Sequence, residues 1–315
     1  MTDKMKIFAG NGNRLLAEKI CKDLKIKIGE AVIDRFSDGE VRVKIVENVR
    51  GEDVFVIQST SAPANEHIME LLIMIDALKR ASASRITAVL PYFGYARQDR
   101  KDQPRVPITA KLVANLLSRA GADRVLTIDL HADQIQGFFD IPLDHLYAVN
   151  DLTAHIKKFN IENLVVVSPD VGGIKRARTF AKKLNADLAI VDKRRIDDKK
   201  IEVMNIMGEV RGRNVVMVDD IVATAGSLTE ASQALKNAGA CDIYVAITHG
   251  VLAGPAVEKI RLSAIKKIFL TDTIHIGNEK ADKLGDKLEI VSVSELFADA
   301  FKRIHNEKSI SVLFQ

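Results

Sequence analysis

Short apolar runs alternate with amphipathic stretches along most of this chain. In the first half, strand-like runs lie at residues 6–9, 54–58, 86–91 and 125–129, and helical patterns cover residues 66–82 and 109–120. The second half repeats the arrangement, with strand-like runs at residues 164–168, 188–192, 214–219, 243–248 and 268–271. Strands that alternate with helices are typical of βαβ units and of a mainly parallel sheet. The pattern therefore predicts an α/β fold.

The length of the chain indicates more than one domain. A chain of 315 residues exceeds the usual size of a single hydrophobic core, so two domains are expected. A duplication would agree with this, because the helix, glycine and strand of residues 109–131 recur at residues 227–249 with a constant offset of 118. Ala-Gly turns are common in α/β folds, so chance similarity stays open as the alternative. We place the domains at residues 1–147 and 148–300.

The last residues of the chain are more apolar than is usual for a terminus. A strand-like run at residues 290–293 and a helical pattern at residues 295–305 precede an apolar segment, residues 309–314. An exposed apolar terminus frays or aggregates, so we expect residues 301–315 to pack on the first domain or on a neighbouring subunit.

Composition and charge narrow the class of protein. Hydrophobic residues make up 47% of the chain, which indicates a globular protein throughout. The formal net charge is only +4, so no general field for nucleic acid is expected. Cys21 and Cys241 fit no metal spacing and indicate a reducing compartment. The N-terminus lacks an apolar signal core, and no apolar run approaches the ~20 residues of a membrane helix. We therefore expect a cytoplasmic protein that does not bind membranes.

Residues 214–227 are the most informative segment. An apolar run reaches Asp219 and Asp220, and the chain then enters a helix through Thr224, Gly226 and Ser227. Ligands of open α/β sheets bind where such strands end. Paired carboxylates accept from neighbouring sugar hydroxyls, and the free N–H groups of a helix N-terminus favour phosphate. The segment predicts a site for a sugar phosphate such as ribose 5-phosphate, and the alternative is an ordinary turn with a helix N-cap.

A loop before the alternating strand at residues 41–46 has the residue types of a purine site. Phe36 can stack on a purine, and the carboxylate of Asp38 or Glu40 can accept from its exocyclic amine. Ser-Asp-Gly is also an ordinary turn sequence, which stays open as the alternative.

Residues 90–101 combine three aromatic residues with a dense cationic cluster. Arg97 and Arg100 can grip phosphate oxygens, and the aromatic rings can stack on a nucleoside. The alternative is a solvated basic loop. A nucleotide site here is unorthodox, because the chain has neither a Gly-x-x-x-x-Gly-Lys-Ser/Thr loop nor a Gly-x-Gly-x-x-Gly fingerprint.

Residues 129–139 place acids, amides and His131 just past a predicted strand. One His with scattered carboxylates fits a Mg²⁺ site in which water and substrate phosphates complete the coordination. Asp170 follows another predicted strand and can help from the neighbouring domain. A structural role is the alternative for any single His.

The segment from Val191 to Arg195 ends a predicted strand and opens a polar stretch, residues 196–200. Cations such as Lys193 and Arg195 on a mobile loop can close over a reacting phosphoryl group and expel water. The alternative is the solvated tip of a hairpin.

Together these segments resemble the class I ribose-phosphate pyrophosphokinases, also called PRPP synthetases. The resemblance runs from Lys6 to Phe314 and rests on these motifs: Arg-Phe-Ser-Asp-Gly-Glu40, Pro-Tyr-Phe-Gly-Tyr-Ala-Arg-Gln-Asp-Arg100, residues 131–139, Ser-Pro-Asp-Val-Gly-Gly173, Lys-Arg-Arg195 and Val-Asp-Asp220. It implies two tandem phosphoribosyltransferase-like domains, each a mainly parallel sheet flanked by helices. It also implies a Mg²⁺-dependent enzyme that transfers the diphosphate of ATP to the C1 hydroxyl of ribose 5-phosphate, giving PRPP and AMP for nucleotide biosynthesis.

The resemblance assigns roles residue by residue. The ATP site would contain Phe36, Asp38, Gly39 and Glu40 from an adjacent subunit, together with Arg97, Gln98 and Arg100. The magnesium ligands would be His131 and Asp170. The ribose 5-phosphate site would contain Arg195, Asp219, Asp220, Ala223, Thr224, Ala225, Gly226 and Ser227. The catalytic residues would be Lys193 and Arg195, which stabilise the β-phosphoryl group as the hydroxyl attacks in line.

The sugar-phosphate loop departs from the family pattern at two positions. The family loop usually reads Asp-Asp-x-x-Asp-Thr-x-Gly-Thr, whereas this chain has Ala223 for the third Asp and Ser227 for the last Thr. Ser keeps a hydroxyl and Ala keeps its backbone N–H, so one carboxylate near the ribose ring is lost. We expect a changed sugar affinity before a loss of turnover.

The resemblance also implies regulation and assembly. Arg50, Arg105, Ser309 and Ser311 match positions of a phosphate or ADP effector site between subunits, although Asn48 stands where some relatives have Ser. Activation by phosphate, inhibition by ADP and a hexamer are therefore expected.

Three interpretations compete at this point. The first is the diphosphokinase. The second is an ordinary phosphoribosyltransferase, which has no need of a first domain bearing Phe36 and Arg97. The third is a non-catalytic associated subunit, an interpretation that only Ala223 supports, because Lys193, Arg195, His131 and Asp170 are intact.

Overall fold

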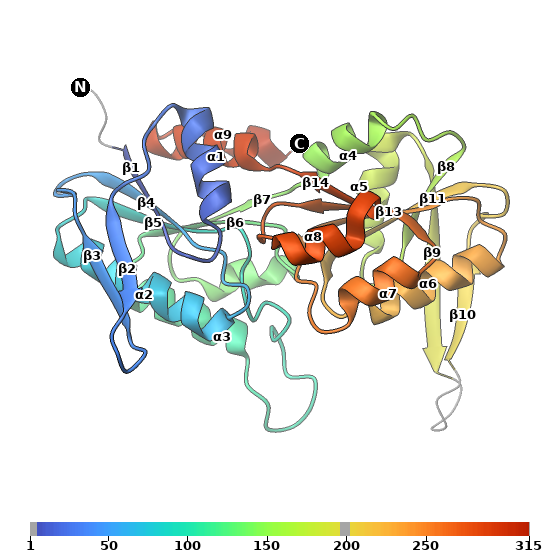
Figure 1. The fold of residues 1–315 in the computed structure, drawn as a ribbon, viewed down its shortest axis with the longest axis horizontal. Helices are drawn as coiled ribbons and strands as arrows, with labels where there is room; N and C mark the ends of the chain where they lie inside the picture. The colour runs from blue at the N-terminus through green and yellow to red at the C-terminus, as the bar shows by residue number, and fades with distance from the viewer. Residues whose placement is uncertain (1–4, 196–201, 315) are drawn as a thin grey trace. The chain divides into compact units, whose positions relative to one another are not determined.

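The computed structural model describes residues 5–195 and 202–314 and leaves aside the side chains of residues 193–195 and 202–204. The chain divides into two compact units (Figure 1). The first unit runs up to Tyr147 and also contains Thr273–His275 and the chain from Val293 onward. The second unit consists of Ala148–Asp272 and Ile276–Ser292.

The first unit contains a sheet in which every strand is parallel to its neighbours. Its strands, in spatial order, are β1 (Met5–Ala9), β4 (Asp53–Ile57), β5 (Arg85–Leu90), β6 (Arg124–Ile128) and β7 (Leu143–Leu146). An antiparallel hairpin is formed by β2 (Ala31–Arg35) and β3 (Val41–Ile45). The helices are α1 (Arg14–Leu24), α2 (Ala64–Arg80), α3 (Thr109–Ala120), η1 (Asp133–Phe138), α9 (Ser294–His305) and η3 (Ser311–Phe314).

Helices cover both faces of this sheet, with α2 and α3 on one face and α1 and α9 on the other (Figure 1). On β4 the side chains alternate, because successive residues of a strand point to opposite faces. Val54 and Val56 belong to the core that contains the inward residues of α2 and α3. Phe55 points to the other face, where its ring stacks on Phe301 of α9 with centroids 4.3 Å apart. A strand buried on both faces reads as a continuous apolar run, as residues 54–57 of β4 do after Asp53.

The second unit contains a larger, mainly parallel sheet. Its strands, in spatial order, are β10 (Glu202–Met207), β9 (Asp187–Arg195), β8 (Leu164–Ser168), β11 (Asn214–Val222), β12 (Ile243–Gly250), β13 (Ile265–Thr271) and β14 (Leu288–Val291). Only the pairing of β10 with β9 is antiparallel. The helices are α4 (Val149–Lys157), α5 (Ile174–Leu184), α6 (Gly226–Asn237), α7 (Ala256–Leu262), α8 (Asn278–Leu284) and η2 (Gly285–Lys287).

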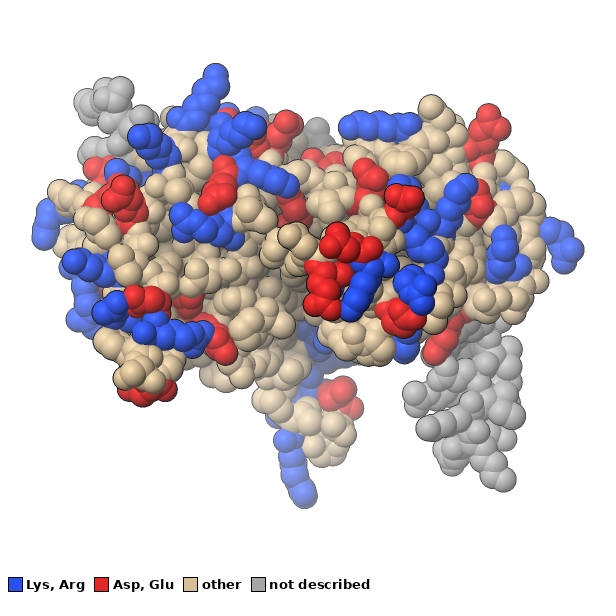
Figure 2. Space-filling view, viewed as in Figure 1, with Lys and Arg blue, Asp and Glu red and all other residues tan. Residues whose placement is uncertain are grey.

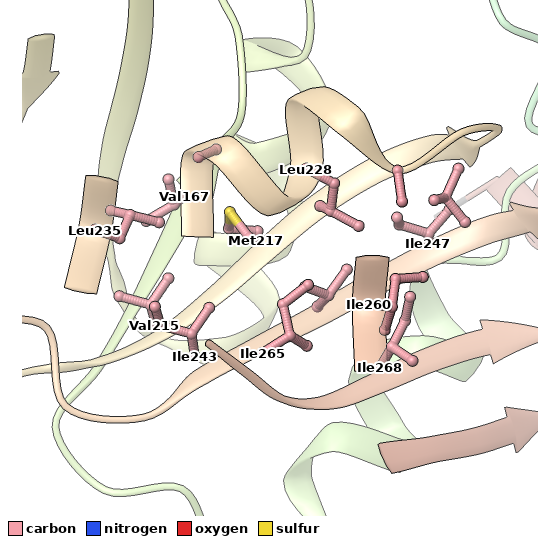
Figure 3. Close-up of a cluster of buried hydrophobic side chains, with 14 of the residues drawn as sticks. Val167, Val215, Met217, Leu228, Leu235, Ile243, Ile247, Ile260, Ile265 and Ile268 are labelled. Atoms are coloured by element: carbon pink, nitrogen blue, oxygen red, sulfur yellow. The ribbon is translucent and has the colours of Figure 1, made fainter. Parts of the chain in front are cut away.

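A continuous apolar core joins this sheet to α6 and α7 (Figure 3). Met217 of β11 and Ile247 of β12 lie in it with Leu228 and Leu235 of α6. Ile260 brings α7 into the same cluster. Because these side chains are almost fully buried, they hold the loop between β11 and α6 on a rigid support.

The expected fold class is confirmed, since each unit has a mainly parallel sheet flanked by helices. The bounds of α3 and β8 agree with the sequence pattern, whereas several strands, among them β9, β11, β12 and β13, are longer than predicted. β9 continues to Arg195 because β10 pairs with its last residues. β11 continues to Val222 because β12 extends with it as far as Gly250. Pairing with a neighbouring strand therefore extends β9 and β11 through polar residues at which the apolar runs have already ended.

Val293 and the first half of α9, residues 294–300, lie in the first unit, whereas we expected residues 293–300 in the second domain. The division after residue 147 coincides with the expected boundary, but the chain from Val293 onward groups with the first unit. Phe301 stacks on Phe55, and Arg85 donates to the carbonyl oxygen of Ile304 at 3.0 Å. His305 Nδ1 lies 2.8 Å from Asp53 Oδ2. These contacts tie α9 to β4 and β5, and the ring of Phe314 contacts Tyr147 beyond it.

No helix among the described residues is long and apolar enough to cross a bilayer. Figure 2 shows Lys and Arg interspersed with Asp and Glu on the visible face of each unit. This mixture agrees with the small net charge of +4.

We expect Phe301→Ala to lower the free energy of unfolding by about 3–5 kcal/mol, because it removes a fully buried ring that stacks on Phe55. Urea unfolding followed by circular dichroism measures the change. Leu262→Ala is the control, since Leu262 is 70% exposed and its truncation should cost less than about 0.5 kcal/mol. Equal losses in the two variants would contradict the proposed anchoring role of α9.

Candidate functional site

The two adjacent acids lie inside β11, not beyond its end. Asp219 pairs in register with Ile247 of β12, and the pairing continues through Val222. On the other side, β8 pairs only as far as Met217. The expectation that the strand ends at Asp219 is therefore wrong by three residues. The acids nevertheless lie near the carboxyl edge of the sheet, beyond the last residue of β11 that pairs with β8.

Arg176 of α5 joins the two acids. Its Nη1 atom lies 3.1 Å from Asp219 Oδ1 and 3.1 Å from Asp220 Oδ1. The side chain of Asp220 is only 5% exposed, so the contact takes place mostly out of water. Burial and the neighbouring Asp220 carboxylate raise the pKa of Asp219, and the charge of Arg176 opposes this rise.

The loop from Ala223 to Ala225 enters α6 without a side-chain cap. The carbonyl oxygen of Ala223 accepts from Ala253 N at 2.8 Å, which fixes the start of the loop. Ala225 adopts the left-handed conformation, with φ 59°, and α6 begins at Gly226. The N-cap residue of α6 is Ala225, which makes no side-chain cap, so the alternative of a side-chain N-cap is contradicted. The first N–H groups of α6 have no intrahelical acceptor, as in any helix, and they leave a place suited to an anion.

A cation that sequence reasoning missed lies beside this loop. A methyl group added to Gly226 would lie 3.5 Å from Lys259 Nζ and 4.0 Å from Thr224 Oγ1. Lys259 stands on α7, and neither its position nor that of Arg176 follows a motif that links it to β11. Each is a basic residue on a helix that packs beside the strand edge, and only tertiary structure brings it there.

Asp170 lies in the turn between β8 and α5. Its Oδ1 atom accepts from Gly173 N at 2.9 Å, and its carbonyl oxygen accepts from Ser168 Oγ at 2.7 Å. Gly173 is required here, because a side chain would begin 2.8 Å from Ser168 Oγ. One carboxylate oxygen of Asp170 thus fixes the turn, and the other has no hydrogen-bond partner among the described residues.

A pocket of about 440 Å³ in the first unit brings together three of the predicted ATP-site residues. Arg97, Gln98 and Arg100 line it, together with His131, which the sequence pattern placed in a separate segment. The lining also includes Asp99, Asp102, Val106, Pro107, Ala132 and Gln134. The connection between β5 and α3 that supplies the arginines projects from the sheet (Figure 1).

Two hydrogen bonds order the pocket wall. Gln98 Oε1 accepts from Thr109 Oγ1 at 2.5 Å, so the amide is oriented by the first residue of α3. Gln134 Nε2 donates to Asp99 Oδ2 at 3.1 Å and links η1 to the arginine loop. Sequence analysis did not assign Gln134 or Thr109 to the site, because a single polar residue carries no periodic signal.

His131 reaches the pocket through a tight turn after β6. Asp129 has a left-handed backbone, with φ 41°, and Leu130 N donates to His145 Nε2 at 2.8 Å. No group of three or more His, Cys, Asp or Glu side chains in residues 5–192 and 205–314 is arranged to hold a metal ion. His131 and Asp170 belong to different units.

The predicted purine loop is the exposed turn between β2 and β3. Phe36 is 50% exposed, and the guanidinium of Arg42 lies 5.6 Å from the centroid of its ring. Asp38 Oδ1 accepts from Glu40 N at 3.1 Å, and Gly39 has φ 95°, which favours glycine. None of these residues lines the pocket of the arginine loop.

The remaining predicted residues are those of the effector site and the two catalytic cations. Arg50 and Arg105 are exposed, and Ser309 Oγ lies 2.7 Å from Ser311 Oγ. The backbone of β9 ends at Arg195, beside Glu202 of β10. The side chains of Lys193 and Arg195 lie outside the described part of the chain.

Comparison with known families places both ends of the chain in one enzyme family. Residues 5–121 match the family described as the N-terminal domain of ribose phosphate pyrophosphokinase. Residues 191–315 match the family described as the phosphoribosyl synthetase-associated domain.

Full-length relatives carry the same name. The chain is 56% identical over 311 residues to ribose-phosphate pyrophosphokinase of Rhizobium meliloti (strain 1021), with 98% of this chain and 100% of the relative covered. It is 55% identical over 311 residues to the enzyme of Bacillus caldolyticus, with 99% and 98% covered. The crystal structure of phosphoribosylpyrophosphate synthetase from Mycobacterium smegmatis matches with a TM-score of 0.91 and 40% identity, covering 97% of this chain and 100% of that one.

Proposed function

The chain belongs to the ribose-phosphate pyrophosphokinase family, and from this premise we propose how its residues divide the work of the reaction. The enzyme transfers the diphosphate of ATP to the C1 hydroxyl of ribose 5-phosphate, which gives PRPP and AMP. The observation that carries this conclusion is similarity over essentially the whole length to relatives of that name. The residue roles below are our proposals.

The acid pair and the loop after it form the proposed sugar-phosphate site. Asp219 and Asp220 accept from the ribose hydroxyls, because carboxylates have several acceptor positions each. The uncapped N–H groups at the start of α6 and the hydroxyls of Thr224 and Ser227 bind the 5-phosphate. Ala223, Ala225 and Gly226 contribute backbone, and Arg195 adds charge at this site.

The pocket of the arginine loop is the proposed triphosphate site. Arg97 and Arg100 neutralise phosphate oxygens, and Gln98 is held in place by Thr109. Phe36, Asp38, Gly39 and Glu40 bind adenine in an adjacent subunit. The exposure of the Phe36 ring supports this role, since a half-exposed aromatic ring on a hairpin turn is accessible to a neighbouring molecule.

Magnesium is the proposed cofactor, with His131 and Asp170 as protein ligands. Mg²⁺ is commonly bound through one or two protein carboxylates, with water and substrate phosphates as the other ligands. A site with few protein ligands agrees with the small number of acidic and His side chains that line the pocket. It also agrees with Asp170, whose Oδ1 atom accepts from Gly173 N and whose Oδ2 atom could bind the ion. When bound, the ion neutralises phosphate charge.

Lys193 and Arg195 are the proposed catalytic residues. The C1 hydroxyl oxygen attacks the β-phosphorus in line, the bond from this phosphorus to the α-phosphate oxygen breaks, and AMP departs. The hydroxyl loses its proton to the surrounding solvent. The two cations balance the charge that develops on the β-phosphoryl group, and catalysis is otherwise a matter of placement.

The proposal extends to assembly and regulation. The chain forms a hexamer in which Arg50, Arg105, Ser309 and Ser311 bind phosphate or ADP between subunits. The adjacent hydroxyls of Ser309 and Ser311 support a site for an anion. A cytoplasmic location is supported by two free cysteines, Cys21 and Cys241, which fit a reducing compartment.

Incubation of the protein with ATP, Mg²⁺ and ribose 5-phosphate tests the function. We expect AMP to appear in equal amount to PRPP and only when the sugar phosphate is present, as followed by chromatography. AMP without the sugar would indicate hydrolysis. No AMP under any condition would favour a non-catalytic subunit, and the proposed function would fail.

Lys193→Ala should reduce kcat by roughly 10²–10³, because the lost charge acts mainly in the transition state. Steady-state kinetics at saturating ATP and ribose 5-phosphate measures the change. Lys280→Ala is the matched control, since Lys280 is an exposed lysine on α8. An unchanged kcat in Lys193→Ala would remove this residue from its role.

Ala223→Asp restores the carboxylate that the family loop usually has. We expect KM for ribose 5-phosphate to change by about tenfold while kcat stays within about twofold, because the added group lies in the sugar-phosphate loop, outside the ATP pocket. Ala223→Asn separates the effect of charge from that of size. If neither KM nor kcat responds to the aspartate, the departure at this position has no consequence for the reaction.

A further inference from the structure

The hairpin of β2 and β3 presents an aromatic ring and a charged pair on one face. Asp34 and Arg42 lie directly opposite each other on the two strands. Phe36 N donates to the carbonyl oxygen of Glu40 at 2.9 Å, so this register continues into the turn. Because alternate residues of a strand point to the same side, the ring of Phe36 shares a face with Asp34 and Arg42. The Cζ atom of Arg42 lies 5.6 Å from the ring centroid.

Asp34 fixes the guanidinium of Arg42 beside this ring. Arg42 Nε donates to Asp34 Oδ1 at 2.7 Å, and Arg42 Nη2 donates to Asp34 Oδ2 at 2.5 Å. Two parallel hydrogen bonds between planar groups set the orientation of the guanidinium as well as its position. The side chains of Arg42 and Asp34 are 52% and 41% exposed, and an ion pair so exposed contributes little to stability. Its effect is therefore mainly on local geometry.

The backbone of the turn is held by bonds that do not involve Arg42. Gly39 N donates to the carbonyl oxygen of Phe36 at 2.9 Å, and Arg35 Nη1 donates to the carbonyl oxygen of Gly39 at 3.0 Å. The ring of Phe36 is 50% exposed, so packing alone does not select its orientation. The contact with Arg42 restricts the ring, because a cation within about 6 Å of a ring centroid is attracted to the face of the ring.

We infer that Arg42 is a positioning residue for the purine base, which holds the ring of Phe36 in one orientation and leaves its other face for stacking. The inference rests on the proposed function, in which Phe36 binds adenine. A ring that is ordered before binding loses less conformational freedom when a base stacks on it, so the base binds more tightly. Arg42 acts through Phe36 and touches neither the phosphates nor the reacting atoms in this arrangement.

A general attraction between ATP and the charge of Arg42 is the competing explanation, and Asp34→Asn separates the two. This variant keeps the charge of Arg42 and removes the carboxylate that anchors it. Loss of the anchor should raise KM for ATP, because the guanidinium no longer stays beside the ring. Loss of a negative charge alone should lower KM for ATP, because the potential around the hairpin becomes more positive.

Steady-state kinetics of the full-length enzyme, followed by the AMP formed, tests the inference. Arg42→Met should raise KM for ATP by about two- to fivefold, the size expected for a cation–π contact at an exposed site. It should leave kcat and KM for ribose 5-phosphate within about 1.5-fold. Asp34→Asn should raise KM for ATP by about twofold. In a Phe36→Leu background, Arg42→Met should change KM for ATP by less than about 1.5-fold, because no ring remains to be positioned.

Arg261→Met is the matched control. Arg261 is 50% exposed and donates to Glu258 through the same two atoms, Nε at 2.9 Å and Nη2 at 2.7 Å. Its loss should leave both KM values unchanged. The inference is overturned if KM for ATP is unaltered in Arg42→Met, changes equally in Arg261→Met, or fails to rise in Asp34→Asn. An equal effect of Arg42→Met with and without the ring of Phe36 overturns it as well. If Arg42→Met does not fold, as judged by circular dichroism, Asp34→Asn decides.

Failure of the proposed function is recognised separately. In that case the unmodified protein forms no AMP from ATP and ribose 5-phosphate. If the unmodified protein is active and Phe36→Leu leaves KM for ATP unchanged, the reaction stands, and the purine role of Phe36 is rejected together with the inference. If Phe36→Leu raises KM for ATP and Arg42→Met does not, only the role of Arg42 is rejected.

Discussion

Two neighbouring carboxylates in one strand impose the main electrostatic constraint on the second unit. Asp219 and Asp220 lie near the end of β11, where β12 still pairs with the strand and β8 no longer does. Their repulsion rises as water is removed, and the guanidinium of Arg176 from α5 offsets part of it. The strand, the helix and the turn that joins β8 to α5 must therefore be held together accurately, and the apolar core under β11 provides this support.

The two units use the edges of their sheets in different ways. In the second unit a short loop leads directly from β11 into α6, and the candidate site there combines acids, backbone N–H groups and nearby cations. In the first unit a long connection between β5 and α3 carries the arginines into a pocket that His131 also lines. In both units the carboxyl ends of parallel strands lie at one edge of the sheet. The connections that follow these strands differ in length, and they bring different side chains to that edge.

Ala223 replaces the Asp that the family loop usually has, and its effect depends on the residues around it. The backbone of Ala223 is held by Ala253, so the loop keeps its start without the family carboxylate. Lys259 lies near Gly226 and adds a positive charge at the same end of α6. The loop of this chain is thus less acidic than the usual family pattern, while the features that favour phosphate are retained.

The fold class, most strands and helices, and the family could be predicted from the sequence alone, because apolar periodicity and contiguous motifs are local properties. It placed α3 and β8 at their observed bounds and identified the acid pair. It did not reveal that β11 runs past both acids, that residues 293–300 group with the first unit, or that Arg176 meets Asp219 and Asp220. These points depend on the folded chain, because strand pairing and side-chain contacts join residues tens or hundreds of positions apart, and no local pattern records such distances.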